Sequence, residues 1–289
     1  MRRGSPVSSP AWGCDMHWPD DHPVRTDPRL AEWQADADAV CPQGSVLAVL
    51  RHVKERRVAT LVRTPDGPGV LKLFASPRAR GNDRRLRALR PAIGSVVPRP
   101  IAVGPKGHAG LLEYVPGRPL RELAGADFIT ACEEVGRVLA QLHACDVLLD
   151  RTWTARSEID NLAHRSGPGG ASWLPPPPDT PVPTHRDLHA AQVVVGPGAV
   201  RLIDLDEATM APPGLDVGNF LAHLDQDAAL GRRPDHETRT AGRAFLRGYG
   251  GPPRDLTWWR EIALARLAVL AEERHDRPDW AASLRALVG

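Results

Sequence analysis

The amino-acid sequence predicts an α+β protein with a small β-rich N-terminal lobe and a mainly helical C-terminal lobe. Three runs of β-branched and aliphatic residues follow one another with polar or Pro-Gly segments between them, which is typical of a three-stranded meander. Farther along, apolar residues recur at helical spacing. A chain of 289 residues, 42% hydrophobic and 25% charged, is long enough for two such lobes.

Charge and cysteine content argue against several classes of protein. With 37 basic and 35 acidic residues, the net charge of +2 indicates neither a nucleic-acid nor a membrane partner. The four cysteines are widely spread without a C-x-x-C pair, which argues against a zinc site or a disulfide framework. No stretch is apolar enough for a signal peptide or a membrane span. We therefore expect a cytoplasmic protein, and the sequence carries no signal for its oligomeric state.

The first part of the chain leads into the predicted meander. Residues 1–27, rich in Pro, Ser and Asp, are expected to form a loosely ordered tail. Pro28 to Val40 has the Ala-rich, mixed-charge composition of a short helix. The strands of the meander are expected at Ser45 to Val53, Arg57 to Arg63 and Val70 to Phe74.

Lys72 is an unusual residue for the middle of the third strand. The chain contains three lysines against 34 arginines, so arginine is used wherever a surface cation suffices. Because side chains alternate along a strand, Lys72 is expected on the face opposite to Leu71 and Leu73. A compact ammonium in that position can pair with the phosphates of a nucleotide. The alternative is a lysine that protects an edge strand from pairing.

The segment from Arg78 to Arg90 is helix-like and contains six arginines, with Asp83 as its only acidic residue. We interpret the arginines as a solvated helix face. The alternative is a patch that binds an anionic ligand or RNA, and this segment is all that supports a role in RNA binding.

One more strand is predicted before the chain becomes mainly helical. Leu111 to Leu120 is expected to run as a strand into a Pro-Gly turn. Ala131 to Cys145 is expected to form a core-facing helix. His143 on that helix is expected to pack in the structure and not to bind a ligand. Helical spacing returns in Glu237 to Tyr249 and Thr257 to Arg274. Trp258 and Trp259 are expected in the core.

The segment from Thr184 to Leu205 carries the clearest chemical pattern in the chain. A hairpin is predicted here, with strands at Val193 to Val195 and Val200 to Ile203 joined by a Gly-Pro-Gly turn. So short a hairpin brings Asp187 and Gln192, before its first strand, close to Asp204 at the end of its second. These oxygen-bearing side chains suit Mg²⁺, a hard cation. Asp187 could then orient an attacking hydroxyl.

The motif HRDLHAAQVVV, followed by LIDLDEA, resembles the catalytic segment of the aminoglycoside phosphotransferase and choline kinase-like family, relatives of protein kinases. The resemblance implies a two-lobed protein kinase-like fold, with the N-lobe at residues 28–117 and the C-lobe, which carries the catalytic loop, at residues 118–289. It covers the chain from about Ser45 to Tyr249.

The resemblance also implies a role for each polar residue of the site. Asp187 would accept the proton of the substrate hydroxyl, while Gln192 and Asp204 would bind Mg²⁺. Lys72 would align the α- and β-phosphates of ATP. Asp83 would substitute for the helix glutamate that pairs with this lysine in kinases.

Further residues are implied to shape the site. Backbone groups of a linker between the lobes, formed by Glu113, Tyr114 and Val115, would meet adenine. His185 would shape the catalytic loop by hydrogen bonding, and Asp216 would bond the backbone of that loop. For Asp206 two alternatives stand, assistance to the metal or exposure to water.

The sequence departs from the family's pattern at two positions of the loop and lacks one of its neighbouring motifs. Gln192 stands where the family usually has Asn, and offers the same amide oxygen on a longer stem, as in the similar HxDxHxxQ loop of maltokinases. Arg186 stands where small-molecule kinases commonly have Gly. No glycine-rich loop joins the first two strands, so the phosphates would depend more on Lys72 and the metal.

Residues and resemblance together predict a phosphotransferase that moves the γ-phosphate of ATP to a hydroxyl group of a small molecule. The alternative is a catalytically silent nucleotide-binding protein, favoured by Gln192 and the missing helix glutamate. A polycationic aminoglycoside needs carboxylates in its pocket. From Leu221 to Gly289 there are ten acidic residues and eleven arginines, which is no acidic excess. A sugar or sugar-containing metabolite is therefore favoured as the acceptor.

Overall fold

The computed structural model describes residues 16–166, 173–176 and 178–288. Internal contacts divide the chain into two compact units. The first comprises the chain up to Asp83 together with Pro100–Tyr114, and the second comprises Arg84–Arg99 together with Val115–Gly289. The lobe boundary expected between residues 117 and 118 stays a prediction. The segment Arg84–Arg99, however, belongs with the helical unit and not with the β-rich one.

The first unit contains a five-stranded antiparallel sheet with the strand order β1-β2-β3-β5-β4. Its strands are β1 (Ser45–Val53), β2 (Arg57–Thr64), β3 (Gly67–Phe74), β4 (Pro100–Val103) and β5 (Ala109–Glu113). The predicted meander is confirmed, because β2 pairs with both β1 and β3. Strand β3 begins at Gly67 and not at the predicted Val70, since Gly67 already pairs with Thr64 across a tight turn.

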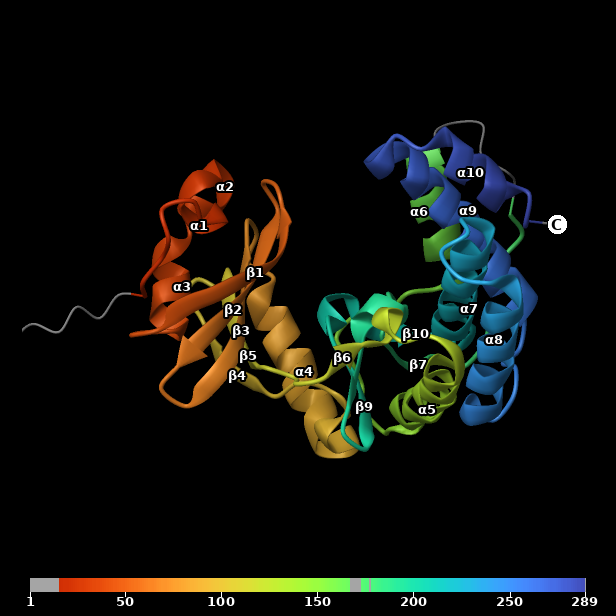
Figure 1. The fold of residues 1–289 in the computed structure, drawn as a ribbon, viewed down its shortest axis with the longest axis horizontal. Helices are drawn as coiled ribbons and strands as arrows, with labels where there is room; N and C mark the ends of the chain where they lie inside the picture. Colours follow the sequence, from red (N-terminus) through yellow and green to blue (C-terminus); the bar gives the residue numbers. More distant parts are fainter. Residues whose placement is uncertain (1–15, 167–172, 177, 289) are drawn as a thin grey trace, which may run out of the picture. The chain divides into compact units, whose positions relative to one another are not determined.

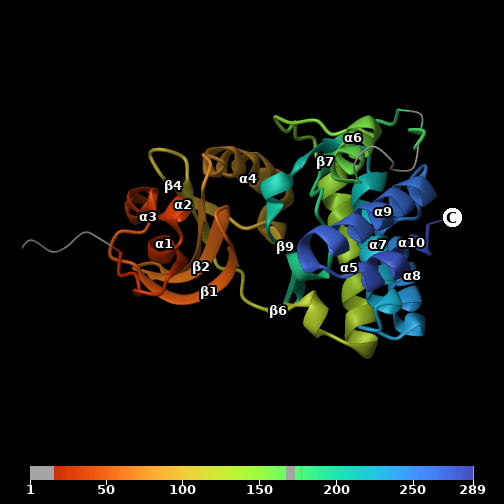
Figure 2. The same cartoon turned by 90° about the horizontal axis from the view of Figure 1, so that it is seen from above.

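Three short helices cover one face of this sheet (Figures 1 and 2). They are α1 (Pro23–Thr26), α2 (Pro28–Ala31) and α3 (Gln34–Val40). Their apolar side chains pack against buried residues of β2, β3 and β5, among them Leu71 and Leu73. The expectation of a loosely ordered tail is wrong for residues 16–27, because Met16, Trp18 and Val24 are buried in the same cluster. Residues 1–15 of that expected tail lie outside the described residues.

Buried carboxylates tie these helices to the turns of the sheet. Asp27 accepts a hydrogen bond from the backbone N–H of Glu55, between β1 and β2, at 2.7 Å. Asp36 accepts bonds from three backbone N–H groups beside β5, those of Lys106, His108 and Ala109, at 2.7–2.9 Å. The single helix predicted for residues 28–40 is divided into α2 and α3 at Trp33, which stacks on His108.

His22 precedes α1 as a buried residue whose hydrogen bonds require a neutral imidazole. Its Nδ1 accepts a bond from the N–H of Val24, and its Nε2 lies 3.0 Å from the hydroxyl of Thr60. Burial lowers the pKa of His22 to about 4, although Asp21 opposes the shift. An unfolded histidine titrates near pH 6.5, as an approximate reference value. Between these two pKa values the unfolded chain binds a proton that the folded chain excludes, so stability decreases as the pH falls.

We expect the wild-type protein to lose about 1.5 kcal/mol more of its free energy of unfolding than His22→Asn between about pH 6.5 and about pH 5. Asn can keep the cap on α1 but takes up no proton in this range. Urea unfolding of both proteins at the two pH values measures the difference. Equal losses would show that His22 is not a titrating group that matters for stability.

The second unit is mainly helical and contains two small sheets with the strand orders β6-β8-β9 and β10-β7. Its strands are β6 (Arg118–Pro119), β7 (Val182–Thr184), β8 (Val193–Gly196), β9 (Ala199–Leu202) and β10 (Thr209–Ala211). Its α-helices are α4 (Ala79–Ile93, from Arg84 onward), α5 (Gly125–Ala144), α6 (Ala155–Ser166), α7 (Gly214–Ala229), α8 (Asp235–Tyr249), α9 (Leu256–His275) and α10 (Pro278–Arg285). Single 3₁₀ turns are η1 (Gly94–Val96), η2 (Leu120–Glu122), η3 (Ala190–Gln192) and η4 (Leu205–Glu207).

Helices α5 and α8 lie side by side in Figures 1 and 2 and pack closely against each other. Two glycines allow this approach, since a methyl group on Gly136 would overlap the carbonyl of Phe245, and one on Gly248 would overlap the carbonyl of Glu133. The predicted helices of this unit are confirmed in α5, α8 and α9. Trp259 is buried as expected, whereas Trp258 is half-buried.

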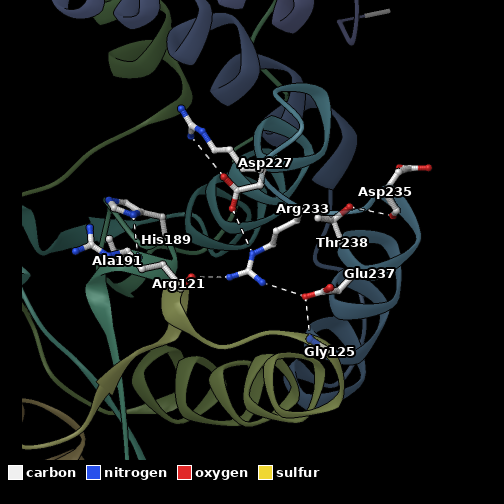
Figure 3. A network of polar contacts seen from close by, with 10 residues as sticks. Arg121, Gly125, His189, Ala191, Asp227, Arg233, Asp235, Glu237 and Thr238 are labelled. Carbon is white, nitrogen blue, oxygen red and sulfur yellow. Dashed lines mark hydrogen bonds and ion pairs between the residues drawn. The ribbon is translucent and has the colours of Figure 1, made fainter.

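An arginine between helices anchors the connection from α7 to α8 (Figure 3). Arg233 contacts Asp227 and Glu237, donates a hydrogen bond to the carbonyl of Arg121, and lies 3.7 Å from the ring centroid of Phe128. Glu237 in turn accepts a bond from the N–H of Gly125 at the start of α5. Charged groups thus fix the N-terminus of α8 against η2 and α5.

The interpretation of the α4 arginines as a solvated face is wrong for Arg85. Its side chain is buried, donating to the backbone carbonyl of Asp206 at 3.0 Å and contacting the carboxylate of Asp150 at 3.3 Å. Arg78, Arg80, Arg84 and Arg87 are exposed as expected. The bonds of Arg85 are one reason why this part of α4 belongs to the helical unit. Over the described residues, the structure contains no helix with the length and apolar character needed to cross a membrane.

Candidate active site

The predicted catalytic segment forms a loop and hairpin next to β7. Strand β7 pairs with β10, and the hydroxyl of Thr184 donates to the carbonyl of Thr209 at 2.8 Å. The chain then passes through residues 185–192, the loop predicted to be catalytic and called the catalytic loop below, into β8, which pairs with β9 as the sequence predicted. Strand β9 ends at Leu202, and Asp204 follows it in a left-handed conformation, with φ of 60°.

Asp216 holds the backbone at the start of the catalytic loop, which confirms its predicted role. Its fully buried carboxylate accepts hydrogen bonds from the N–H groups of His185 and Arg186 at 2.7 and 2.6 Å. It also lies 3.2 Å from Nε2 of His143, whose Nδ1 contacts the hydroxyl of Tyr249 at 2.8 Å. His143 is therefore a packed residue, as predicted, and α5, α7 and α8 together support the loop.

His185 shapes the loop through both ring nitrogens, as predicted. Its Nε2 lies 2.8 Å from the carbonyl oxygen of Ile203, and its Nδ1 accepts a hydrogen bond from the backbone N–H of Asp187 at 3.4 Å. The protonated nitrogen is therefore Nε2, which donates to Ile203. This ring links the residue before Asp204 to the backbone of Asp187.

The structure brings Gln192 and Asp204 together. The amide nitrogen of Gln192 donates to the carboxylate of Asp204 at 3.3 Å, and the backbone carbonyl of Gln192 accepts from the N–H of Ile203 at 2.9 Å. The longer side chain of glutamine thus reaches the aspartate that the hairpin was expected to place beside it. The carboxylate of Asp206 is buried, so the alternative that it faces water is wrong.

His189, a residue that the sequence interpretation did not single out, also belongs to this site. Its Nδ1 accepts a bond from the N–H of Ala191 at 3.3 Å (Figure 3), and its ring lies 4.6 Å from that of His223 on α7. Burial lowers the pKa of His189, although the carboxylates of Asp187 and Asp204 both oppose the shift. The second histidine of the HxDxH pattern was the signal that could have identified it.

Two oxygen-bearing side chains beside the hairpin match the ligand preferences of Mg²⁺. In the described part of the chain, no group of three or more His, Cys, Asp or Glu side chains could hold a metal. Mg²⁺ in nucleotide sites is commonly bound through one or two carboxylates, with waters and phosphates completing the shell. The Asp204 carboxylate and the Gln192 amide, which is able to present its oxygen after rotation about its last torsion, fit that smaller set.

The residues predicted to bind nucleotide lie mostly in the first unit. Lys72 sits in the central strand β3, paired with Ala59 and Gly110, so the alternative of an edge-strand lysine is wrong. Leu71 and Leu73 are buried in the core, which leaves Lys72 on the opposite face, as predicted. Asp83 lies in α4 and Glu113 ends β5, followed by the exposed Tyr114 and by Val115, which is buried in the second unit. Their contacts with a nucleotide stay predictions.

Arg186 has a backbone conformation that glycine would adopt without strain. Its φ is 71°, in the left-handed region, which costs an L-residue about 1–2 kcal/mol. Its guanidinium contacts Glu207 at 2.7 Å and lies 3.6 Å from the ring centroid of Trp153. The side chain therefore takes part in contacts that a glycine would lack.

The comparison with known protein families gives a match over more than half of the chain. The sequence model of the family described as "Phosphotransferase enzyme family" matches residues 54–262. No curated protein matches the chain in sequence.

Several solved structures share the fold. Aminoglycoside phosphotransferase APH(4)-Ia is 16% identical, with a TM-score of 0.60 over 85% of this chain and 94% of its own. Choline kinase LicA from Streptococcus pneumoniae is 13% identical, with a TM-score of 0.57 over 84% and 92%. Spectinomycin phosphotransferase APH(9)-Ia, in complex with ADP and spectinomycin, is 15% identical, with a TM-score of 0.52 over 85% and 89%. These likenesses confirm the predicted protein kinase-like α+β fold.

Proposed function

The chain belongs to the phosphotransferase enzyme family, and from this premise we propose that it transfers the γ-phosphate of ATP, with Mg²⁺, to a hydroxyl group of a sugar or sugar-containing metabolite. Membership of the family confirms the resemblance found in the catalytic segment. It also confirms the prediction of a small-molecule kinase that acts on a hydroxyl group. The ions, the residue roles and the sugar are the parts that we propose.

The observation that carries the proposal is the loop around Asp187. Asp216 and His185 fix the backbone on the N-terminal side of Asp187, and the hairpin brings Gln192 to Asp204. In this proposal Asp187 accepts the proton of the acceptor hydroxyl, Gln192 and Asp204 would hold Mg²⁺, and Lys72 would align the phosphates of ATP. Mg²⁺ supplies positive charge to the phosphate oxygens when it is bound. The chain itself contributes mainly positioning and preorganised electrostatics.

The preference for a sugar rests on the charge around the catalytic loop. Glu158 forms an ion pair with Arg266, and Glu207 pairs with both Arg151 and Arg186. Carboxylates engaged in this way offer little to a polycation, which has to replace the hydration of several ammonium groups. The balance of ten acidic residues and eleven arginines from Leu221 to Gly289 supports the same choice.

The cytoplasm is the location that we propose for this reaction. Cys41, Cys132 and Cys145 are free thiols, two of them buried, which supports a reducing compartment.

An ADP-release screen with Mg·ATP tests the proposal. The acceptors are aminoglycosides, sugars, amino alcohols and nucleosides, each measured with and without an excess of EDTA. We expect turnover with a sugar or a sugar-containing compound, and its loss when the metal is chelated.

Each other outcome bears on a different part of the proposal. Efficient turnover of an aminoglycoside and none of sugars would refute the acceptor class and leave the phosphotransferase standing. If no acceptor in the panel is turned over although Mg·ATP raises the melting temperature, the catalytically silent nucleotide-binding alternative is favoured. Turnover that persists without divalent metal would refute the role of Gln192 and Asp204.

A further inference from the structure

The backbone of the catalytic loop is strained directly before Asp187. Arg186 is in the left-handed region, with φ of 71°, where only glycine is free of a steric penalty. Such a conformation persists only when the surroundings over-determine it, and it is found preferentially at active sites. The contacts that maintain it are therefore candidates for residues that set the position of Asp187.

Contacts of the Arg186 side chain lead away from the loop. The guanidinium stacks over the ring of Trp153, 3.6 Å from its centroid, and bonds Glu207 at 2.7 Å. The indole N–H of Trp153 donates to the carboxylate of Glu158 on α6 at 2.8 Å. The Trp153 ring thus contacts Arg186 of the loop with its face and the buried carboxylate of Glu158 with its edge.

A second series of contacts leads back to the loop from the same carboxylate. The other oxygen of Glu158 lies 3.0 Å from Nε of Arg266 on α9. Arg266 donates to the side-chain oxygen of Asn219 on α7. Asn219 in turn donates from its amide nitrogen to the backbone carbonyl of Leu188 at 2.9 Å. The contacts therefore start one residue before Asp187 and end one residue after it.

We call this closed set the loop brace. It consists of Arg186, Trp153, Glu158, Arg266, Asn219 and the carbonyl of Leu188. Glu158 and Asn219 are buried, and only 15% of the Arg266 side chain is exposed. Buried hydrogen bonds and ion pairs resist rearrangement, because a group that loses its partner is left desolvated.

We propose that the loop brace positions Asp187 for proton acceptance, with Glu158 and Arg266 as positioning residues that act on the loop through Trp153 and Asn219. This inference rests on the proposed phosphotransfer. Removal of a brace residue should let the loop move relative to the acceptor hydroxyl. A displacement of about 1 Å can cost an enzyme about 10²-fold in rate.

The test compares Glu158→Gln and Arg266→Ala with Arg260→Ala. Arg260 also lies on α9 and pairs with Asp225 on α7, so its replacement breaks a link between the same two helices outside the loop brace. We expect kcat to fall about tenfold or more in both brace variants while the KM for ATP changes by less than about twofold. Arg260→Ala should keep both constants. Glu158→Gln preserves shape and serves if Arg266→Ala fails to fold.

Hydrogen exchange of the peptide that spans residues 184–192 gives a readout that does not require turnover. We expect faster exchange there in the brace variants than in Arg260→Ala. Unchanged exchange and unchanged kcat in folded Glu158→Gln and Arg266→Ala would overturn the loop brace. If the wild-type protein transfers phosphate to no acceptor, the proposed function is refuted, and with it the role of the brace in proton acceptance. Hydrogen exchange of residues 184–192 would still decide whether the loop brace holds the loop.

Arg186→Gly separates the effect of the side-chain contacts of residue 186 from the effect of its backbone conformation. Glycine adopts the left-handed conformation freely, so this variant should fold with a melting temperature close to that of the wild type. We expect its kcat to fall as in Arg266→Ala, because the contact between the side chain of residue 186 and the Trp153 ring is lost. Wild-type kcat in Arg186→Gly would show that the side chain does not position Asp187.

Discussion

Replacement of Asp187 by Asn is expected to lower kcat by about 10² or more, the scale of a positioned general base, while Mg·ATP still stabilises the protein. The amide has the size of the carboxylate but does not accept the proton of the acceptor hydroxyl. The backbone N–H of residue 187 still donates to His185, so the loop should keep its shape. Initial rates of ADP release on the acceptor found in the screen measure the effect, and thermal melts with Mg·ATP report binding.

A matched control for Asp187→Asn is Asp160→Asn. Asp160 is an exposed residue of α6 that pairs with Arg156 at 2.9 Å, and exposed pairs of this kind contribute little. We expect its kcat to equal that of the wild type. Full turnover by Asp187→Asn on a confirmed acceptor would show that another group accepts the proton.

The strands and the hairpin could be predicted from the sequence because their signals are local. Strand β1 has the predicted bounds, and the two strands of the catalytic hairpin pair as the Gly-Pro-Gly turn indicated. Lys72 was placed correctly on the face opposite to Leu71 and Leu73, since alternation along a strand needs no knowledge of the rest of the chain. Within the site, the short hairpin likewise allowed the closeness of Gln192 and Asp204 to be predicted from the local sequence.

The errors concern residues whose surroundings come from distant parts of the chain. Met16 and Trp18 lie in a segment rich in Pro and Asp, and only the apolar face of the sheet makes them core residues. Arg85 looked like its exposed neighbours, but Asp150 and the carbonyl of Asp206 provide the partners that allow its burial. Composition alone does not identify such partners.

The support of the catalytic loop was predictable only in part. The resemblance identified Asp216 and His185, which are close to motif positions, and the structure confirms their bonds. The loop brace could not be predicted from the sequence, because Glu158 and Arg266 come from helices that no motif marks. Helix α6 was itself missed, since its polar sequence carries a weak apolar pattern.

Asp216→Asn is expected to reduce the free energy of unfolding by about 3 kcal/mol and to lower turnover of the folded protein strongly. The two carboxylate oxygens accept from different backbone groups, Oδ2 from His185 and Oδ1 from Arg186. An amide places its NH₂ group against one of these N–H donors, so a buried, charge-assisted hydrogen bond is lost and its donor is left unsatisfied, at a combined cost of about 3 kcal/mol.

Asp225→Asn is the control for Asp216→Asn on the same helix, because Asp225 pairs with Arg260, which is about half exposed. Its loss should cost about 1 kcal/mol or less and leave kcat unchanged. Urea unfolding measures stability, and kcat is referred to the folded fraction of each variant.

Since the carboxylate of Asp216 fixes the strained backbone of Arg186, its replacement should also speed hydrogen exchange of residues 184–192. A stable Asp216→Asn protein with normal kcat would show that the loop before Asp187 keeps its conformation without this carboxylate.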